Sequence, residues 1–154
     1  MIHIQRILVA TDFSEHARNA LRYGAEFAKA FGAELLLCHV VEADSLIAQL
    51  PPGGEGYFPP NVTERQQHLA RTEGENWLHE AAIERGRVVL RVGKAFVEIV
   101  HAAREENVDL IVVGTHGRGA IAHMLLGSVA EKVVRKAPCP VLTVRAGEHE
   151  FVMP

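Results

Sequence analysis

The residues best suited to chemistry lie between 114 and 128, in the pattern Gly-x2-Gly-x9-Gly-Ser. Gly114, Gly117, Gly127 and Ser128 supply this pattern. Glycine lacks a Cβ atom, so the backbone can turn tightly there and an anion can approach its N–H groups. A helix that begins at Gly127-Ser128 adds N–H donors without intrahelical partners and a partial positive charge. A flexible connection between a strand and a helix is the alternative interpretation of the glycines. The helix start beside Ser128 favours the binding of a phosphate group.

Polar side chains within this segment are open to more than one interpretation. Arg118 can pair with a phosphate through two N–H groups, and a solvated loop arginine is an equal alternative. Ser128 and Glu131 form the S-x-x-E pattern of a capping box, yet the same hydroxyl can contact a phosphate oxygen. His116 and His123 are too isolated from other ligand types to predict a zinc site. The spacing matches neither a Walker A loop nor the GxGxxG fingerprint.

Asp12 is a second candidate, because it follows the apolar run Ile7–Ala10 directly after Thr11. A carboxylate at this place can cap a turn or accept hydrogen bonds from ribose hydroxyls. Because it would repel a triphosphate, we assign Asp12 to ribose or to a metal rather than to phosphate. We find no specific nucleophile–base pair or carboxylate pair, and this weakens an interpretation as an enzyme.

Strand-like and helix-like patterns alternate along the chain and must position these residues. Apolar runs predict five strands, at 7–10, 35–41, 87–92, 109–113 and 140–144. Helical spacing predicts four helices: one from Ser14 to a C-cap at Gly32, one over about 62–85 that Gly86 ends, one around 96–103, and one around 130–137.

This alternation predicts an α/β fold, an open doubly wound parallel sheet with helices on both faces. Right-handed crossovers place the carboxyl ends of the strands at one edge, where ligands of such folds bind. Three segments meet there, 11–12, 41–60 and 114–127.

Composition indicates one ordinary globular domain. The chain has 154 residues, of which 48% are hydrophobic and 23% are charged. We assign 1–147 to one domain with a variable loop at 42–60, and 148–154 to a tail. A net charge of −3 indicates no drive toward nucleic acid or a membrane. Without a leader or a membrane-spanning run, and with Cys38 and Cys139 in apolar runs, we expect a cytoplasmic protein with reduced thiols.

The chain resembles the universal stress protein family over almost its whole length. The segments that carry the resemblance are Ile7–Ser14, His39–Val41, Asp109–Gly117, Gly127–Ala130 and Ala137–Val144. The resemblance implies a five-stranded, Rossmann-like parallel sheet in the order 3-2-1-4-5 and a homodimer formed through the final strand, 140–145. An apolar strand at a sheet edge is also a liability that pairing removes.

The resemblance extends to a nucleotide site, because the ATP-binding members carry Gly-x2-Gly-x9-Gly followed by Ser or Thr. It implies that Asp12 meets the ribose, Val40 the adenine, and Thr115, Ser128 and Val129 the phosphates. The complete candidate site is Ala10, Thr11, Asp12, Val40, Gly114, Thr115, His116, Gly117, Arg118, Gly127, Ser128 and Val129. We expect Mg²⁺ or Mn²⁺ to accompany the triphosphate, because the loop offers few fixed cations.

Three functions fit these observations. The first is an ATP-binding stress-response protein that acts as a nucleotide-dependent switch or sensor. The second is a slow ATPase or self-phosphorylating enzyme on the same scaffold, against which the missing catalytic base counts. The third is an interaction module for unknown protein partners in which no nucleotide takes part.

Overall fold

Five parallel strands form one sheet in the order β3-β2-β1-β4-β5, as the resemblance implies. The computed structural model describes residues 1–42, 62–116 and 126–145. The strands are β1 (Arg6–Thr11), β2 (Glu34–Val41), β3 (Gly86–Val92), β4 (Leu110–Gly114) and β5 (Val141–Val144). The helices are α1 (Glu15–Phe31), α3 (Val62–Glu80), α4 (Ala95–Glu105) and α5 (Ser128–Lys136). Most of the loop expected at 42–60, and the tail expected at 148–154, lie outside the described residues.

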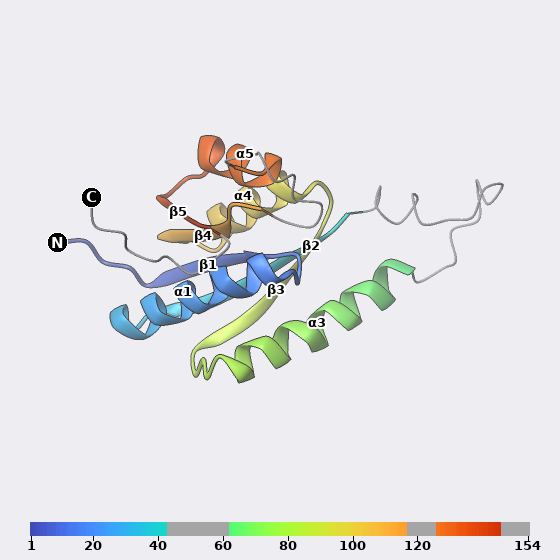
Figure 1. Ribbon diagram of the computed structural model, residues 1–154, viewed down its shortest axis with the longest axis horizontal. Coiled ribbons are helices and arrows are strands. Elements are labelled where there is room, and N and C mark those ends of the chain that lie inside the picture. The colour runs from blue at the N-terminus through green and yellow to red at the C-terminus, as the bar shows by residue number, and fades with distance from the viewer. Residues whose placement is uncertain (43–61, 117–125, 146–154) are drawn as a thin grey trace.

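Helices cover both faces of the sheet, which confirms the doubly wound α/β prediction. Side chains alternate along β1, so Ile7 and Val9 pack under α1 and α3 while Leu8 and Ala10 pack under α4 and α5. In Figure 1, α4 and α5 lie together at the top of the view, and α1 and α3 lie nearer its lower side. The strands are apolar at nearly every position because both of their faces are buried.

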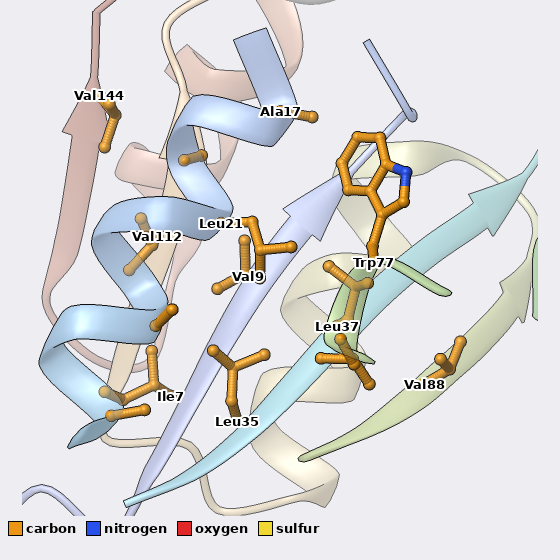
Figure 2. Packing of buried hydrophobic residues seen from close by; sticks show 14 of the residues in the cluster. Ile7, Val9, Ala17, Leu21, Leu35, Leu37, Trp77, Val88, Val112 and Val144 are labelled. Atoms are coloured by element: carbon orange, nitrogen blue, oxygen red, sulfur yellow. The ribbon is translucent and has the colours of Figure 1, made fainter. Parts of the chain in front are cut away.

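The core has two layers, one on each face of the sheet. The larger layer lies between the sheet and helices α1 and α3. Figure 2 shows Trp77 of α3 on the same side of the strands as Ala17 and Leu21 of α1. Leu35 and Leu37 of β2 complete this layer and are fully buried. Each such side chain contributes roughly 1.5–3 kcal/mol to folding relative to an exposed one. The strands that lead to the site are therefore held by a closely packed layer.

Both ends of α1 follow the sequence prediction. The Ser14 hydroxyl accepts the N–H of Ala17 at 3.2 Å, which satisfies one of the free donors of the first turn. Gly32 adopts the left-handed conformation, with φ of 65°, and its N–H donates to the last turn. The residue after β1 and the start of α1 are thus fixed relative to each other.

The end of α3 differs from the prediction of a helix over about 62–85 that stops at Gly86. The helix ends at Glu80, and Gly86 is instead the first residue of β3. Ala82 takes the left-handed conformation, with φ of 52°, that was expected of a glycine. The Leu35 N–H donates to the Arg85 carbonyl at 2.9 Å, so the chain is already aligned along β2 before Gly86. Sheet pairing overrides the local helical pattern here.

Candidate functional site

The candidate residues that the structure describes lie at the carboxyl edge of the sheet, most of them between β1 and β4 and one, Val40, on β2. From β1 the chain runs outward through β2 and β3, then returns to place β4 on the other side of β1. The order of strands therefore reverses at this point, which is where open α/β sheets bind ligands. Ala10 and Thr11 end β1, Gly114 ends β4, and Ser128 begins α5 nearby.

Two glycines allow these segments to approach each other. The Gly127 N–H donates to the Thr115 carbonyl oxygen at 2.5 Å, and a Cβ atom at Gly127 would lie 2.9 Å from that same oxygen. A Cβ atom at Gly114 would lie 3.2 Å from the carbonyl oxygen of His16. Gly127 has an ordinary φ of −65°, so close approach of the backbone, and not a special turn, requires glycine there.

The start of α5 excludes one of the two interpretations of Ser128, that of a helix cap. Gly127 is the N-cap and Ser128 is the first helical residue, so Ser128 is not placed to cap the helix. The Glu131 carboxylate pairs with Arg135 in the next turn, at 3.0 Å. The capping-box prediction is therefore wrong, because a box needs its serine at the N-cap. The Ser128 hydroxyl is exposed at the edge of the sheet.

Thr115 and His116 continue β4 into the site. Thr115 is only 3% exposed; its N–H donates to the Val144 carbonyl at 2.9 Å. Its Oγ1 lies 3.0 Å from Nδ1 of His116. The ring of His116 lies 6.0 Å, between centroids, from the ring of His16 in the first turn of α1. Sequence reasoning missed His16, because its spacing within α1 gives no sign of what the sheet brings beside it.

Asp12 lies in a tight turn between β1 and α1. One of its carboxylate oxygens accepts the N–H of Ser14 at 3.0 Å, which is the hydrogen bond of an Asx-turn. The Oγ1 atom of Thr11 accepts the N–H of Phe13 at 3.0 Å in the same turn. Asp12 therefore caps the turn, which is one of the two roles predicted for it. A carboxylate has enough lone pairs to accept further hydrogen bonds as well.

Val40 lies on the face of β2 that α4 and α5 cover, and it is half-buried there. Phe96, near the start of α4, and Leu126, next to Gly127, are partly buried against the same layer. Sequence reasoning named Val40 but not these two. The sequence offered two signals for them: both are apolar, and Leu126 precedes Gly127 while Phe96 lies at the start of a helix.

Several sequence predictions fall beyond what is described. Gly117, Arg118 and His123 lie outside the described residues. Among residues 1–42, 62–116 and 126–145, no group of three or more His, Cys, Asp or Glu side chains could hold a metal ion. In the same ranges, none of the helices is both long and apolar enough to cross a membrane.

A sequence model of the universal stress protein family matches residues 3–145 of this chain. The chain belongs to this family. A universal stress protein of Thermus aquaticus is 38% identical over 141 residues, which cover 90% of this chain and 97% of the relative. The solved structure of MJ0577 from Methanocaldococcus jannaschii superposes with a TM-score of 0.81 at 31% identity, covering 96% of this chain and all of the other.

Two further solved structures of universal stress proteins contain adenine nucleotides. One is a complex with cAMP, with a TM-score of 0.68 and 26% identity over 95% of this chain and 100% of that one. The other, from Archaeoglobus fulgidus, is a complex with dAMP, with a TM-score of 0.60 and 25% identity over 93% of this chain and 98% of that one. These similarities confirm the fold and place the chain among proteins of which some bind adenine nucleotides.

Proposed function

We propose that this protein binds ATP at the carboxyl edge between β1 and β4 and acts as a nucleotide-dependent switch or sensor in the stress response. The contact between Gly127 and the Thr115 carbonyl carries the proposal. It fixes the start of α5 at the strand-order reversal, where the first N–H groups of a helix attract phosphate. The cAMP and dAMP complexes of relatives support an adenine nucleotide as the ligand class.

The described residues divide the site by chemistry. Thr115, Ser128 and Val129 lie at the phosphate end, beside the start of α5. Asp12 accepts the ribose hydroxyls, and the half-buried Val40 offers an apolar surface for adenine. Phe96 and Leu126 extend that apolar surface.

A divalent cation would accompany the triphosphate. Magnesium is commonly held by one or two carboxylates together with substrate phosphates, and does not need a cage made only of protein. Because Asp12 serves the ribose in this proposal, the phosphate oxygens of ATP would hold the cation. The cation would neutralise phosphate charge there.

A glycine substitution tests the proposal. We expect Gly127→Ala to weaken ATP binding about tenfold or more, a loss of ~1.4 kcal/mol, because its Cβ collides with backbone and displaces the start of α5. Isothermal titration calorimetry with Mg²⁺ present measures the dissociation constant. Gly74→Ala is the matched control, because its Cβ also collides, 2.8 Å from Cγ2 of Val88, but does so on α3, away from the site.

Two results would contradict the proposal. One is an absence of ATP binding at millimolar concentration by folded wild-type protein. The other is an equal dissociation constant for wild type and Gly127→Ala.

A further inference from the structure

The turn that carries Asp12 contains a backbone conformation that needs external support. Phe13, the next residue, has a φ of 60°, in the left-handed region. A bulky residue rarely adopts this conformation, and it persists only where surrounding contacts impose it. The contacts around Phe13 therefore determine the shape of the turn.

Two rings from other elements surround Phe13. The ring of His39, at the end of β2, lies 4.7 Å from it between centroids at a tilt of 37°. The indole of Trp77, on α3, meets it edge-on at 5.3 Å and 89°. We call Phe13, His39 and Trp77 the aromatic cluster. Such offset and edge-to-face arrangements are the favoured geometries of ring pairs.

The aromatic cluster also contacts the turn on the other side of Asp12. Nδ1 of His39 donates to the carbonyl oxygen of Thr11 at 2.9 Å. His39 thus holds the backbone before Asp12 by a hydrogen bond and the side chain after it by ring contact. His39 therefore contacts the residues on both sides of Asp12 in the chain.

Trp77 is itself firmly placed. Its side chain is 3% exposed, and its indole N–H donates to the Glu73 carboxylate at 2.7 Å. The guanidinium of Arg18 lies 4.3 Å from the centre of the indole and pairs with Glu80 at 2.7 Å. Figure 2 shows this indole beside the first turn of α1, at Ala17. Helices α1 and α3 together therefore fix the ring that supports Phe13.

We propose that the aromatic cluster positions the Asp12 carboxylate for the ribose hydroxyls of the nucleotide. His39 and Trp77 hold Phe13 in its left-handed conformation, and this sets the Asx-turn that orients Asp12. The three rings are positioning residues and touch no ligand in this role. The inference rests on the proposed nucleotide site, and it makes α3 a structural determinant of nucleotide specificity.

A first measurement needs no nucleotide. Phe13→Ala removes the ring contacts, so amide hydrogen exchange should become at least about tenfold faster at Ser14, whose N–H bonds to Asp12. Phe31→Ala is the control, because Phe31 is the last residue of α1, far from the turn, is 48% exposed and stacks only on Phe27 among the described ring pairs. That control should leave the exchange at Ser14 unchanged. If Phe13→Ala does not fold, Phe13→Leu replaces it.

A second measurement separates positioning from general stability. Wild type should prefer ATP over 2′,3′-dideoxy-ATP about tenfold, because Asp12 accepts the hydroxyls. Phe13→Ala and Asp12→Ala should each reduce this preference to about twofold or less, and the double variant should lose no more. Trp77→Phe, which keeps an aromatic ring, should retain most of the preference, and Phe31→Ala all of it.

The outcomes distinguish this inference from the proposed function. A folded Phe13→Ala variant with wild-type exchange at Ser14, or with the wild-type preference for ATP over the dideoxy analogue, overturns the positioning role. Wild-type protein that binds neither nucleotide overturns the proposed function and the ribose role of Asp12. In that case the exchange data alone decide whether the aromatic cluster holds the turn.

Discussion

The two cysteines show how burial alone sets the reactivity of a residue. Cys38 lies on β2 under the α4–α5 layer and is 1% exposed. Burial raises the pKa of its thiol to about 12, because the thiolate would lose its solvation. Cys139 lies between α5 and β5 and is half-buried, and burial raises its pKa as well. The two thiols therefore differ in how far solvent can reach them.

Thiol labelling should reflect this difference. With Ellman's reagent at pH 8, we expect Cys139 to react in the native protein and Cys38 to react only after unfolding. At that pH the Cys38 thiol stays protonated, because burial raises its pKa, and its side chain is only 1% exposed to the reagent. Cys139→Ser should abolish the native reaction, whereas Cys38→Ser should leave it in place. A native Cys139→Ser protein that still reacts at once would contradict the prediction.

At the scale of elements, ion pairs join the amino ends of the strands, opposite the candidate site. Arg87 of β3 pairs with Glu34 of β2 at 3.0 Å and with Glu106, just after α4, at 2.5 Å. Arg6 of β1 contacts Glu34 at 3.5 Å. The hydrogen bond from Arg87 lowers the pKa of Glu106 below its ordinary value of 4.5. The pair therefore joins α4 to the edge strand only while Glu106 is ionised.

Acid unfolding should report this pair. Because the pKa of Glu106 is lower in the folded state, its stabilisation is complete above the ordinary pKa of 4.5 and is lost as the pH falls through the folded value. We expect Glu106→Gln to cost ~1 kcal/mol or less at pH 7 and to flatten the loss of unfolding free energy below pH 4.5. Urea unfolding from pH 7 to pH 3 measures it. Glu131→Gln, which breaks the exposed pair with Arg135, is the control. A Glu106→Gln profile parallel to wild type would refute the assignment.

At the scale of the molecule, the two sheet edges differ. Edge strand β3 carries Arg87 and Arg91, whose charges discourage pairing with another chain. Edge strand β5 is apolar and short, with Val141 and Leu142 only half-buried. Val134 of the neighbouring helix α5 is 46% exposed. We therefore propose that a homodimer forms through β5.

A proline in β5 tests this dimer without disturbing the monomer's own sheet. The carbonyls of Pro140 and Val144 accept hydrogen bonds from β4, so the alternating residues Val141 and Thr143 direct their backbone groups outward. Thr143→Pro removes one outward N–H, and we expect it to shift the protein from dimer to monomer in light scattering after gel filtration. Thr143→Val, which keeps that donor, should remain dimeric. A dimeric Thr143→Pro protein would exclude pairing along this strand.

Local patterns in the sequence predicted most of the fold. The five strands and four helices, the N-cap at Ser14 and the C-cap at Gly32 are all confirmed within the described residues. These features depend on side-chain periodicity and on the free groups at helix ends, which neighbouring residues determine. The sequence also predicted that Gly114 and Gly127 lie at the carboxyl edge of the sheet, where the structure places them. The nucleotide site assigned to that edge stays a prediction.

Tertiary contacts decided the remainder. Pairing with β2 moved the end of α3 to Glu80, and backbone packing on Thr115 made Gly127 the N-cap in place of Ser128. The aromatic cluster joins Phe13, His39 and Trp77 from three separate elements, so no local pattern could reveal it. The sequence by itself determined which elements form and which candidate residues follow the strands, because those features depend on neighbours along the chain. Only the folded structure decided how the turn at Asp12 is held, because that depends on residues that meet only in space.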